Sequence, residues 1–220
     1  LLLSYPNNPT GAVMERERLL QVARFAQEND LVVISDEIYE RFVYGIEHTC
    51  VASLPGMQER TLLLGGFSKS HAMTGWRIGY ACGPREIIQA MHKVHQYIIM
   101  SAPTIAQVGA LGAFASEDDG SAQIMREFSA RRGIMLQGLR SIGLPCFKSR
   151  GAIYLFPSIA HTGLTSAEFS ERLLLQEKVA VVPGDAFGPS GEGFVRVAYT
   201  RPASDLEEAL ESIERFVHRL

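Results

Sequence analysis

The stretch L-V-V-I-S-D-E-I-Y-E at residues 31–40 decides the predicted fold of this chain. Residues 31–34 are apolar at every position, as in a parallel strand that helices cover on both faces. Similar strands are predicted at residues 1–5, 61–64 and 77–82, and apolar residues at three- and four-residue steps predict a helix at 15–28. This alternation of strands and helices indicates an α/β fold with a mostly parallel sheet between helices.

Two helices are predicted after these strands, and beyond residue 120 the pattern changes. A helix is expected from residue 85, with an apolar stripe that includes Met91 and Ile98, and a longer one from 121 to 140. Three strand-like segments follow, at 152–156, 179–182 and 194–199, with capping boxes T-x-x-E at 165–168 and S-x-x-E at 204–207 opening further helices. The polar stretch 116–120 predicts a boundary between one domain at 1–118 and a smaller α+β domain at 119–220.

The composition excludes several classes of protein. Of the 220 residues 46% are hydrophobic and 20% charged, with a net charge of −3 and no block of like charges, which argues against direct nucleic-acid binding. No apolar run is long enough to predict a membrane span. The three cysteines lie far apart, and there is no H-E-x-x-H motif, so neither a disulfide framework nor a metal site is expected. A reducing cytoplasm is the expected location.

Polar side chains follow three of the predicted strands. Asn8 follows the first, Asp36 and Tyr39 follow the second, and Ser68 and Lys69 follow the third. In parallel α/β sheets the reactive groups collect beyond the carboxyl ends of the strands, so one crevice is expected to gather these groups. We also expect a cis bond before Pro9, because Asn8 has to turn sharply after its strand.

This set of groups suits pyridoxal 5'-phosphate (PLP). That cofactor needs a lysine amine, a carboxylate for its ring nitrogen, donors to its ring oxygen and ligands for its phosphate. Lys69 is the candidate amine and Asp36 the candidate carboxylate. The other candidate cofactor-binding residues are Asn8, Tyr39, Ser68 and Arg77.

Seven motifs in order along the chain strengthen this interpretation. They are N-P-T-G (8–11), S-D-E-I-Y (35–39), F-S-K-S (67–70), G-W-R-I-G-Y (75–80), G-A-I-Y-L-F-P (151–157), V-P-G-D-A-F-G (182–188) and V-R-V-A-Y (195–199). Together they resemble the fold-type I, class I/II PLP-dependent aminotransferases, the group that includes aspartate aminotransferase. The resemblance spans the whole chain.

The resemblance implies a role for each matching residue. Lys69 is implied to bind the cofactor and move a proton at the substrate Cα, with Asp36 on the ring nitrogen and Asn8 and Tyr39 on the ring oxygen. The phosphate is assigned to Ser68 and Arg77. Substrate binding is assigned to Asn8 and to Arg196, whose planar fork matches a carboxylate. The implied catalytic residues are Lys69, Asp36 and Tyr39.

The implied activity is transfer of an amino group between an amino acid and a 2-oxo acid by a homodimer. In the family, a phosphate-cradling loop and a ring-stacking aromatic precede N-P-T-G. The apolar residues of the first predicted strand begin at Leu1 itself, without a polar segment before them, so we expect the chain to begin inside a domain. We also expect the chain to be inactive alone. The alternatives are a PLP-dependent lyase or decarboxylase of the same fold, the sensor domain of a transcription regulator, and an inactive fragment.

Overall fold

The computed structural model describes residues 1–115 and 121–220, which form two compact units. The first unit contains Leu1–Pro6 and Val13–Ser121, and the second contains Asn7–Ala12 and Ala122–Leu220. The domain boundary predicted between residues 118 and 119 lies outside the described residues. The hexapeptide Asn7–Ala12 belongs to the second unit, although its neighbours along the chain belong to the first.

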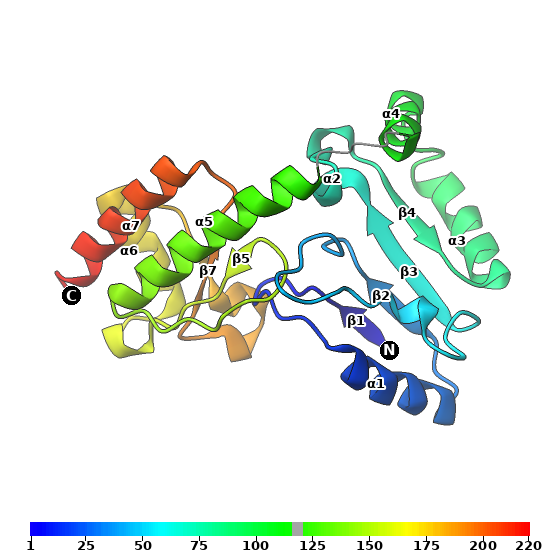
Figure 1. Cartoon of the computed structure of the whole chain (residues 1–220), viewed down its shortest axis with the longest axis horizontal. Coiled ribbons are helices and arrows are strands. Elements are labelled where there is room, and N and C mark those ends of the chain that lie inside the picture. The colour runs from blue at the N-terminus through cyan, green and yellow to red at the C-terminus, as the bar shows by residue number, and fades with distance from the viewer. Residues whose placement is uncertain (116–120) are drawn as a thin grey trace. The chain divides into compact units, whose positions relative to one another are not determined.

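A four-stranded sheet organises the first unit (Figure 1). Its strands lie in chain order: β1 (Leu2–Ser4), β2 (Val33–Asp36), β3 (Thr61–Gly66) and β4 (Gly79–Cys82). β1, β2 and β3 run parallel, with Asp36 opposite both Ser4 and Leu64, whereas β4 is antiparallel to β3. The predicted mostly parallel α/β sheet is therefore confirmed.

Four helices accompany this sheet: α1 (Arg16–Glu28), α2 (Phe67–Ser70), α3 (Arg85–Ile98) and α4 (Thr104–Ala115). The spacing of Leu19, Ala23 and Ala26 places them on one face of α1, where all three are buried. They pack into one cluster with Val33 of β2. The other buried members of this cluster are Val51, Leu54 and Met57.

Helices α3 and α4 carry exposed apolar side chains. The predicted α3 forms, but its apolar stripe is not buried, since Met91 is 37% and Ile98 77% exposed. Helix α4 was not predicted, because its own residues are apolar on every side and therefore show no amphipathic period. The spacing of apolar residues predicts which of them share a face of α3. It does not predict what packs against that face.

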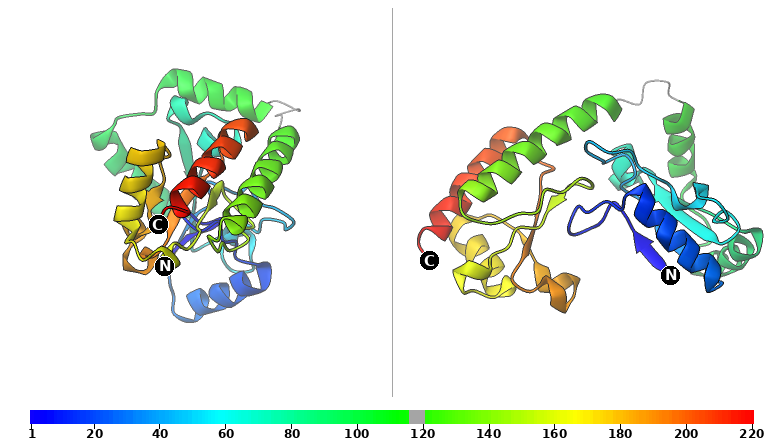
Figure 2. Two further views of the ribbon diagram at one scale, coloured as in Figure 1. Left: turned by 90° about the vertical axis from the view of Figure 1, so that its left-hand side faces the viewer. Right: turned by 60° about the horizontal axis from the view of Figure 1, so that its bottom comes forward.

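The second unit contains a three-stranded antiparallel sheet and three helices. The strands lie in the order β5 (Tyr154–Leu155), β7 (Val195–Ala198) and β6 (Val182–Pro183), each shorter than the segment expected for it. The helices are α5 (Ser121–Ser141), α6 (Ser166–Glu177) and α7 (Ala203–Val217). Figure 2 shows α5 and α7 side by side, and Gly138 of α5 lies against Leu210 of α7. The predicted α+β pattern is present.

The two predicted capping boxes have different outcomes. In α6 the Thr165 Oγ1 accepts from the Glu168 amide at 3.2 Å, and the Glu168 carboxylate accepts from the Thr165 amide at 2.9 Å. The box predicted at Ser204 is wrong, because α7 already begins at Ala203. Pro202 has φ −53°, close to the value that the proline ring imposes, so the helix can start at the next residue.

We expect Thr165→Ala to weaken α6 by about 1 kcal/mol, because the helix loses the acceptor for its third amide. Hydrogen–deuterium exchange of the α6 amides should become about fivefold faster. Thr200→Ala is the control, because Thr200 is exposed and should leave the exchange unchanged. Equal exchange in Thr165→Ala and the unmodified protein would contradict the capping role.

Candidate active site

Asp36 and Lys69 lie beyond neighbouring parallel strands of the first unit. Asp36 is the last residue of β2 and stands opposite Leu64 of β3, while α2, which carries Lys69, begins directly after β3 (Figure 1). The Asp36 Oδ1 accepts from the Ile38 amide at 3.2 Å, which orients the carboxylate at the end of its strand. Within the described part of the chain, the Lys69 side chain has no hydrogen bond or ion pair.

Aromatic packing anchors the short helix α2. Phe67 is 3% exposed, and its ring contacts the rings of His71, Tyr80 and Phe114 at centroid distances of 5.1, 5.8 and 4.9 Å. The Ser70 hydroxyl donates to the Gly66 carbonyl at 3.0 Å. Helix α2 is therefore held from both of its ends, and the half-buried Lys69 between them projects from a fixed backbone.

Ser68 and Arg77 are linked through one residue, Thr74. The Thr74 hydroxyl donates to the Ser68 carbonyl at 2.9 Å, and the Arg77 Nη1 donates to the Thr74 carbonyl at 2.8 Å. Arg77 is exposed and left-handed, with φ 55° and ψ 51°, a conformation that costs a non-glycine residue about 1–2 kcal/mol. An exposed guanidinium that is linked through Thr74 to the backbone of Ser68 is suited to binding an anion.

Tyr39 is buried in the turn that follows Asp36. It is 6% exposed, and its carbonyl accepts from the Phe42 amide at 2.8 Å. Phe42 and Tyr44 are buried as well, at 4% and 7% exposure. This turn is therefore packed into the unit, with its backbone position defined by the rings that follow it.

Asn8 and Arg196 meet in the second unit. The Arg196 Nη1 donates to the Asn8 Oδ1 at 2.8 Å, across 188 residues of sequence. The bond before Pro9 is cis, as predicted. The loop that carries Asn8 is held by Gly11, whose carbonyl accepts from the amides of Arg150 and Gly151 at 3.1 and 2.9 Å. The structure thus brings together the two residues predicted to bind substrate.

Two aromatic rings lie against the Arg196 guanidinium. Its Cζ is 4.4 Å from the ring centroid of Tyr154 and 4.9 Å from that of Phe187. Its Nε is buried and has no hydrogen-bond partner in the described residues. Rings against a guanidinium favour approach of an anion in the guanidinium plane, which is the geometry of a bidentate carboxylate.

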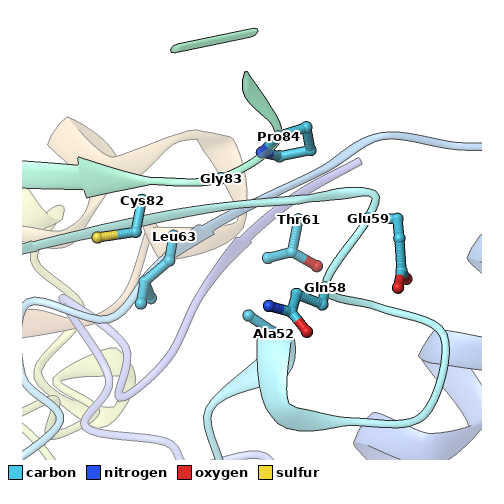
Figure 3. A pocket seen from close by; sticks show the side chains of 8 residues that line it. All are labelled: Ala52, Gln58, Glu59, Thr61, Leu63, Cys82, Gly83 and Pro84. Carbon is cyan, nitrogen blue, oxygen red and sulfur yellow. The ribbon is translucent and has the colours of Figure 1, made fainter. Parts of the chain in front are cut away.

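A separate pocket of about 490 Å³ lies on the first unit (Figure 3). Thr61, Leu63 and Cys82 are among the residues around it, and the predicted site residues are not. Among the described residues, no three His, Cys, Asp or Glu side chains are placed to hold a metal ion, and no helix is long and apolar enough to cross a membrane.

Comparison with known proteins assigns the family. The model for aminotransferase class I and II matches residues 1–213. The chain belongs to the class I and II aminotransferases. It is 46% identical to an aspartate aminotransferase of Pyrococcus abyssi and 44% identical to aromatic-amino-acid aminotransferase 2 of Thermococcus litoralis, with 98% of the chain aligned in each case. The chain spans 56% of the length of both relatives.

A solved structure agrees with this assignment to the class I and II aminotransferases. An aromatic aminotransferase from Pyrococcus horikoshii matches with a TM-score of 0.97 at 44% sequence identity, covering all of this chain and 60% of its own. The family resemblance predicted from the seven motifs is therefore confirmed.

Several residues around the site of this class I and II aminotransferase chain were not predicted as functional. Tyr154 and Phe187 lie within quoted motifs, but their contact with Arg196 depends on the pairing of β5 with β7 and on the loop after β6. Thr74 was also missed, because its link between Ser68 and Arg77 uses backbone carbonyls that have no sequence signature. A signal for the two rings was their place in segments that flank the strand of Arg196.

Gly11 offers a test of the Asn8 loop. Its φ is +69°, and an added Cβ would lie 2.5 Å from Ser149 Cβ and 2.8 Å from the Gly151 carbonyl oxygen. We expect Gly163→Ala to lower the free energy of unfolding of the second unit by about 1–2 kcal/mol, because φ is +72° there but nothing lies within 4 Å. Gly11→Ala should cost about 1–3 kcal/mol more, through overlap. Urea denaturation measures both, and equal losses would contradict the close packing at Gly11.

Proposed function

We propose that the protein is a PLP-dependent aminotransferase that moves an amino group between an amino acid and a 2-oxo acid. The observation that carries the proposal is the Lys69 amine, which has no partner in the described residues and follows a strand whose parallel neighbour ends in Asp36. The relatives named above are aminotransferases, which favours amino transfer over a lyase, a decarboxylase or a sensor.

The residues present fit the cofactor. A cofactor-binding lysine has to be an available amine, and Lys69 is half-buried without an ion pair in the described chain. Asp36 offers a carboxylate at the end of β2, and Arg77 offers an exposed guanidinium close to Ser68 through Thr74. When bound, PLP would supply an aldehyde that accepts amino groups and a ring that accepts electrons.

Each residue of the first unit has a proposed task. The Asp36 carboxylate would hold a proton at the ring nitrogen, and the Tyr39 hydroxyl would donate to the ring oxygen. Ser68 and Arg77 would bind the phosphate through charge-assisted hydrogen bonds. The Lys69 amine would hold the cofactor and then take a proton from the substrate Cα and return it.

In the second unit, Arg196 would bind the substrate α-carboxylate. With its Nη1 on the Asn8 Oδ1 and two rings against the guanidinium, the side chain is oriented before a carboxylate arrives. Because the Asn8 oxygen accepts from Arg196, its amide nitrogen stays available to donate to the cofactor's ring oxygen. Preorganisation of this kind reduces the entropy that binding has to overcome.

We further propose a cytoplasmic homodimer with a cofactor-binding domain at 1–118 and a small domain at 119–220. Three free thiols, at Cys50, Cys82 and Cys146, support a reducing compartment. The exposed apolar side chains of α3 and α4 support association with a further protein surface. They include Val94, Tyr97, Ile98, Val108, Leu111 and Phe114.

Reduction with borohydride tests the proposed role of Lys69. Here and in the PLP experiments below, the protein is used in a form that includes the phosphate-cradling loop expected before N-P-T-G. We expect this form, loaded with PLP, to absorb visible light and, after reduction, to carry the pyridoxyl group on Lys69 in a peptide map. Lys93, Lys148 and Lys178 serve as internal controls in the same digest. A label on one of these lysines, or the same labelling in Lys69→Ala, would refute the assignment.

Arg196→Lys tests the proposed carboxylate site. The substitution keeps the charge but loses the planar fork, so we expect 2-oxo acid binding to weaken by about 1.5–3 kcal/mol with PLP still bound. Titration of the cofactor absorbance with a 2-oxo acid measures the dissociation constant. Arg201→Lys is the matched control, because Arg201 is exposed and pairs with Asp205 on α7. Unchanged affinity in Arg196→Lys would show that the carboxylate binds elsewhere.

A further inference from the structure

Glu37, the residue after Asp36, carries a buried carboxylate with three donors. It is 4% exposed. Its Oε1 accepts from the Ser35 hydroxyl at 2.8 Å and from the Val51 amide at 3.0 Å, and its Oε2 lies 2.6 Å from the His48 Nε2. Because a carboxylate can only accept, the His48 Nε2 has to carry the hydrogen of that contact.

The Glu37 side chain remains ionised at neutral pH despite its burial. Burial is the largest single influence and raises its pKa, but the hydrogen bonds from His48, Val51 and Ser35 together bring the pKa below its usual value. The Glu37 carboxylate is therefore a buried charge, and both of its oxygens accept hydrogen bonds. Loss of one donor or of the charge leaves other buried polar atoms without a partner.

The carboxylate closes the loop that carries Tyr39. Ser35 of β2 and Glu37, the residue directly after β2, are buried, whereas Asp36 between them is half-buried, which is the alternation expected of an extended chain. The Glu37 side chain binds His48 and Val51, which lie 11 and 14 residues further along the chain, so it joins the two ends of the loop at residues 38–50. Tyr39 lies at the start of this loop.

The backbone of Glu37 also determines the orientation of its neighbours. Its amide donates to the Leu64 carbonyl at 2.9 Å, and its carbonyl accepts from the Glu40 amide at 2.9 Å. The Asp36 carboxylate accepts from the amide of Ile38, directly after Glu37. A rotation of the Glu37 peptide would therefore disturb both the Asp36–Ile38 hydrogen bond and the turn that carries Tyr39.

We propose that Glu37, with Ser35 and His48, is a positioning residue that holds Asp36 and Tyr39 in the orientation needed to bind the pyridine ring. The inference rests on the proposed function, since it concerns the same cofactor. Glu37 acts through its two neighbours and does not touch the ring itself. Neither the motif resemblance nor the sequence spacing assigned it a role.

The experiment follows the absorbance of bound PLP as a function of pH in Glu37→Gln. Glutamine keeps an acceptor for Val51 but removes the negative charge and presents an amide donor to the His48 Nε2, so the charge-assisted hydrogen bond from His48 is lost. With a weaker donor to the cofactor's ring oxygen, the deprotonated chromophore is less stable. We expect the pH midpoint of the absorbance change to rise by about 0.5–1 unit.

Kinetics and exchange supply independent measurements. We expect kcat to fall about tenfold with KM for the amino acid within twofold, because Arg196 is unchanged. In the protein without cofactor, amides at residues 38–50 should exchange faster in Glu37→Gln. His48→Ala removes the donor to the carboxylate, whereas His48→Gln keeps a donor there. The absorbance midpoint of His48→Gln should therefore lie much closer to that of the unmodified protein than the midpoint of His48→Ala.

Glu177→Gln is the matched control. Its carboxylate, which binds Arg215 and Arg219 between α6 and α7, is 8% exposed. Glu177→Gln should lower the free energy of unfolding without shifting the pH midpoint of the PLP absorbance. If Glu37→Gln does not fold, the pair His48→Ala and His48→Gln gives the same comparison.

The outcomes separate the two proposals. An unmodified protein without a visible band and without a borohydride label on Lys69 would overturn the proposed function, and the positioning role with it. A normal band in the unmodified protein with the same midpoint in Glu37→Gln, or in both His48 variants, would overturn the positioning role alone. A midpoint shift of equal size in Glu177→Gln would identify the effect as general destabilisation and would also overturn it.

Discussion

The parallel pairing of β1, β2 and β3 is the constraint on which the first unit depends. Strands that run in one direction bring their carboxyl ends to the same edge of the sheet, so the polar residues after each strand collect there. Asp36 and the α2 segment with Lys69 occupy that edge because β2 and β3 are neighbours. The apolar cluster under α1 holds the strands in this register, since a slip of one residue would reverse every side chain.

A second constraint operates around Arg196, where a charge is held ready for a ligand. The guanidinium is positioned by one hydrogen bond to Asn8 and by the rings of Tyr154 and Phe187. These contacts orient the group without neutralising it, because none of the three partners is an anion. An arginine without a carboxylate partner retains its affinity for an incoming one.

Glu37 shows the opposite arrangement, a charge that the fold satisfies completely for an internal purpose. Three donors surround its carboxylate, and it follows Asp36 directly and precedes Tyr39 by two residues. Lys69, which has no partner among the described residues, and Arg77, in its left-handed conformation, are proposed to bind a ligand, whereas Glu37 is proposed to support such groups. The two kinds of group differ in whether the fold itself already supplies partners for the charge.

The sequence alone determined the α/β class and the family, and it supplied the candidates for the site residues, because strand hydrophobicity, turn residues and short motifs are local properties. It also predicted the Thr165 cap, which involves four consecutive residues. Only the tertiary structure decided that Asn8 binds Arg196, that rings cover the guanidinium and that Glu37 joins His48 to Val51. These contacts join residues 9 to 188 positions apart, and which groups meet depends on strand order and loop packing, which leave no local pattern in the sequence.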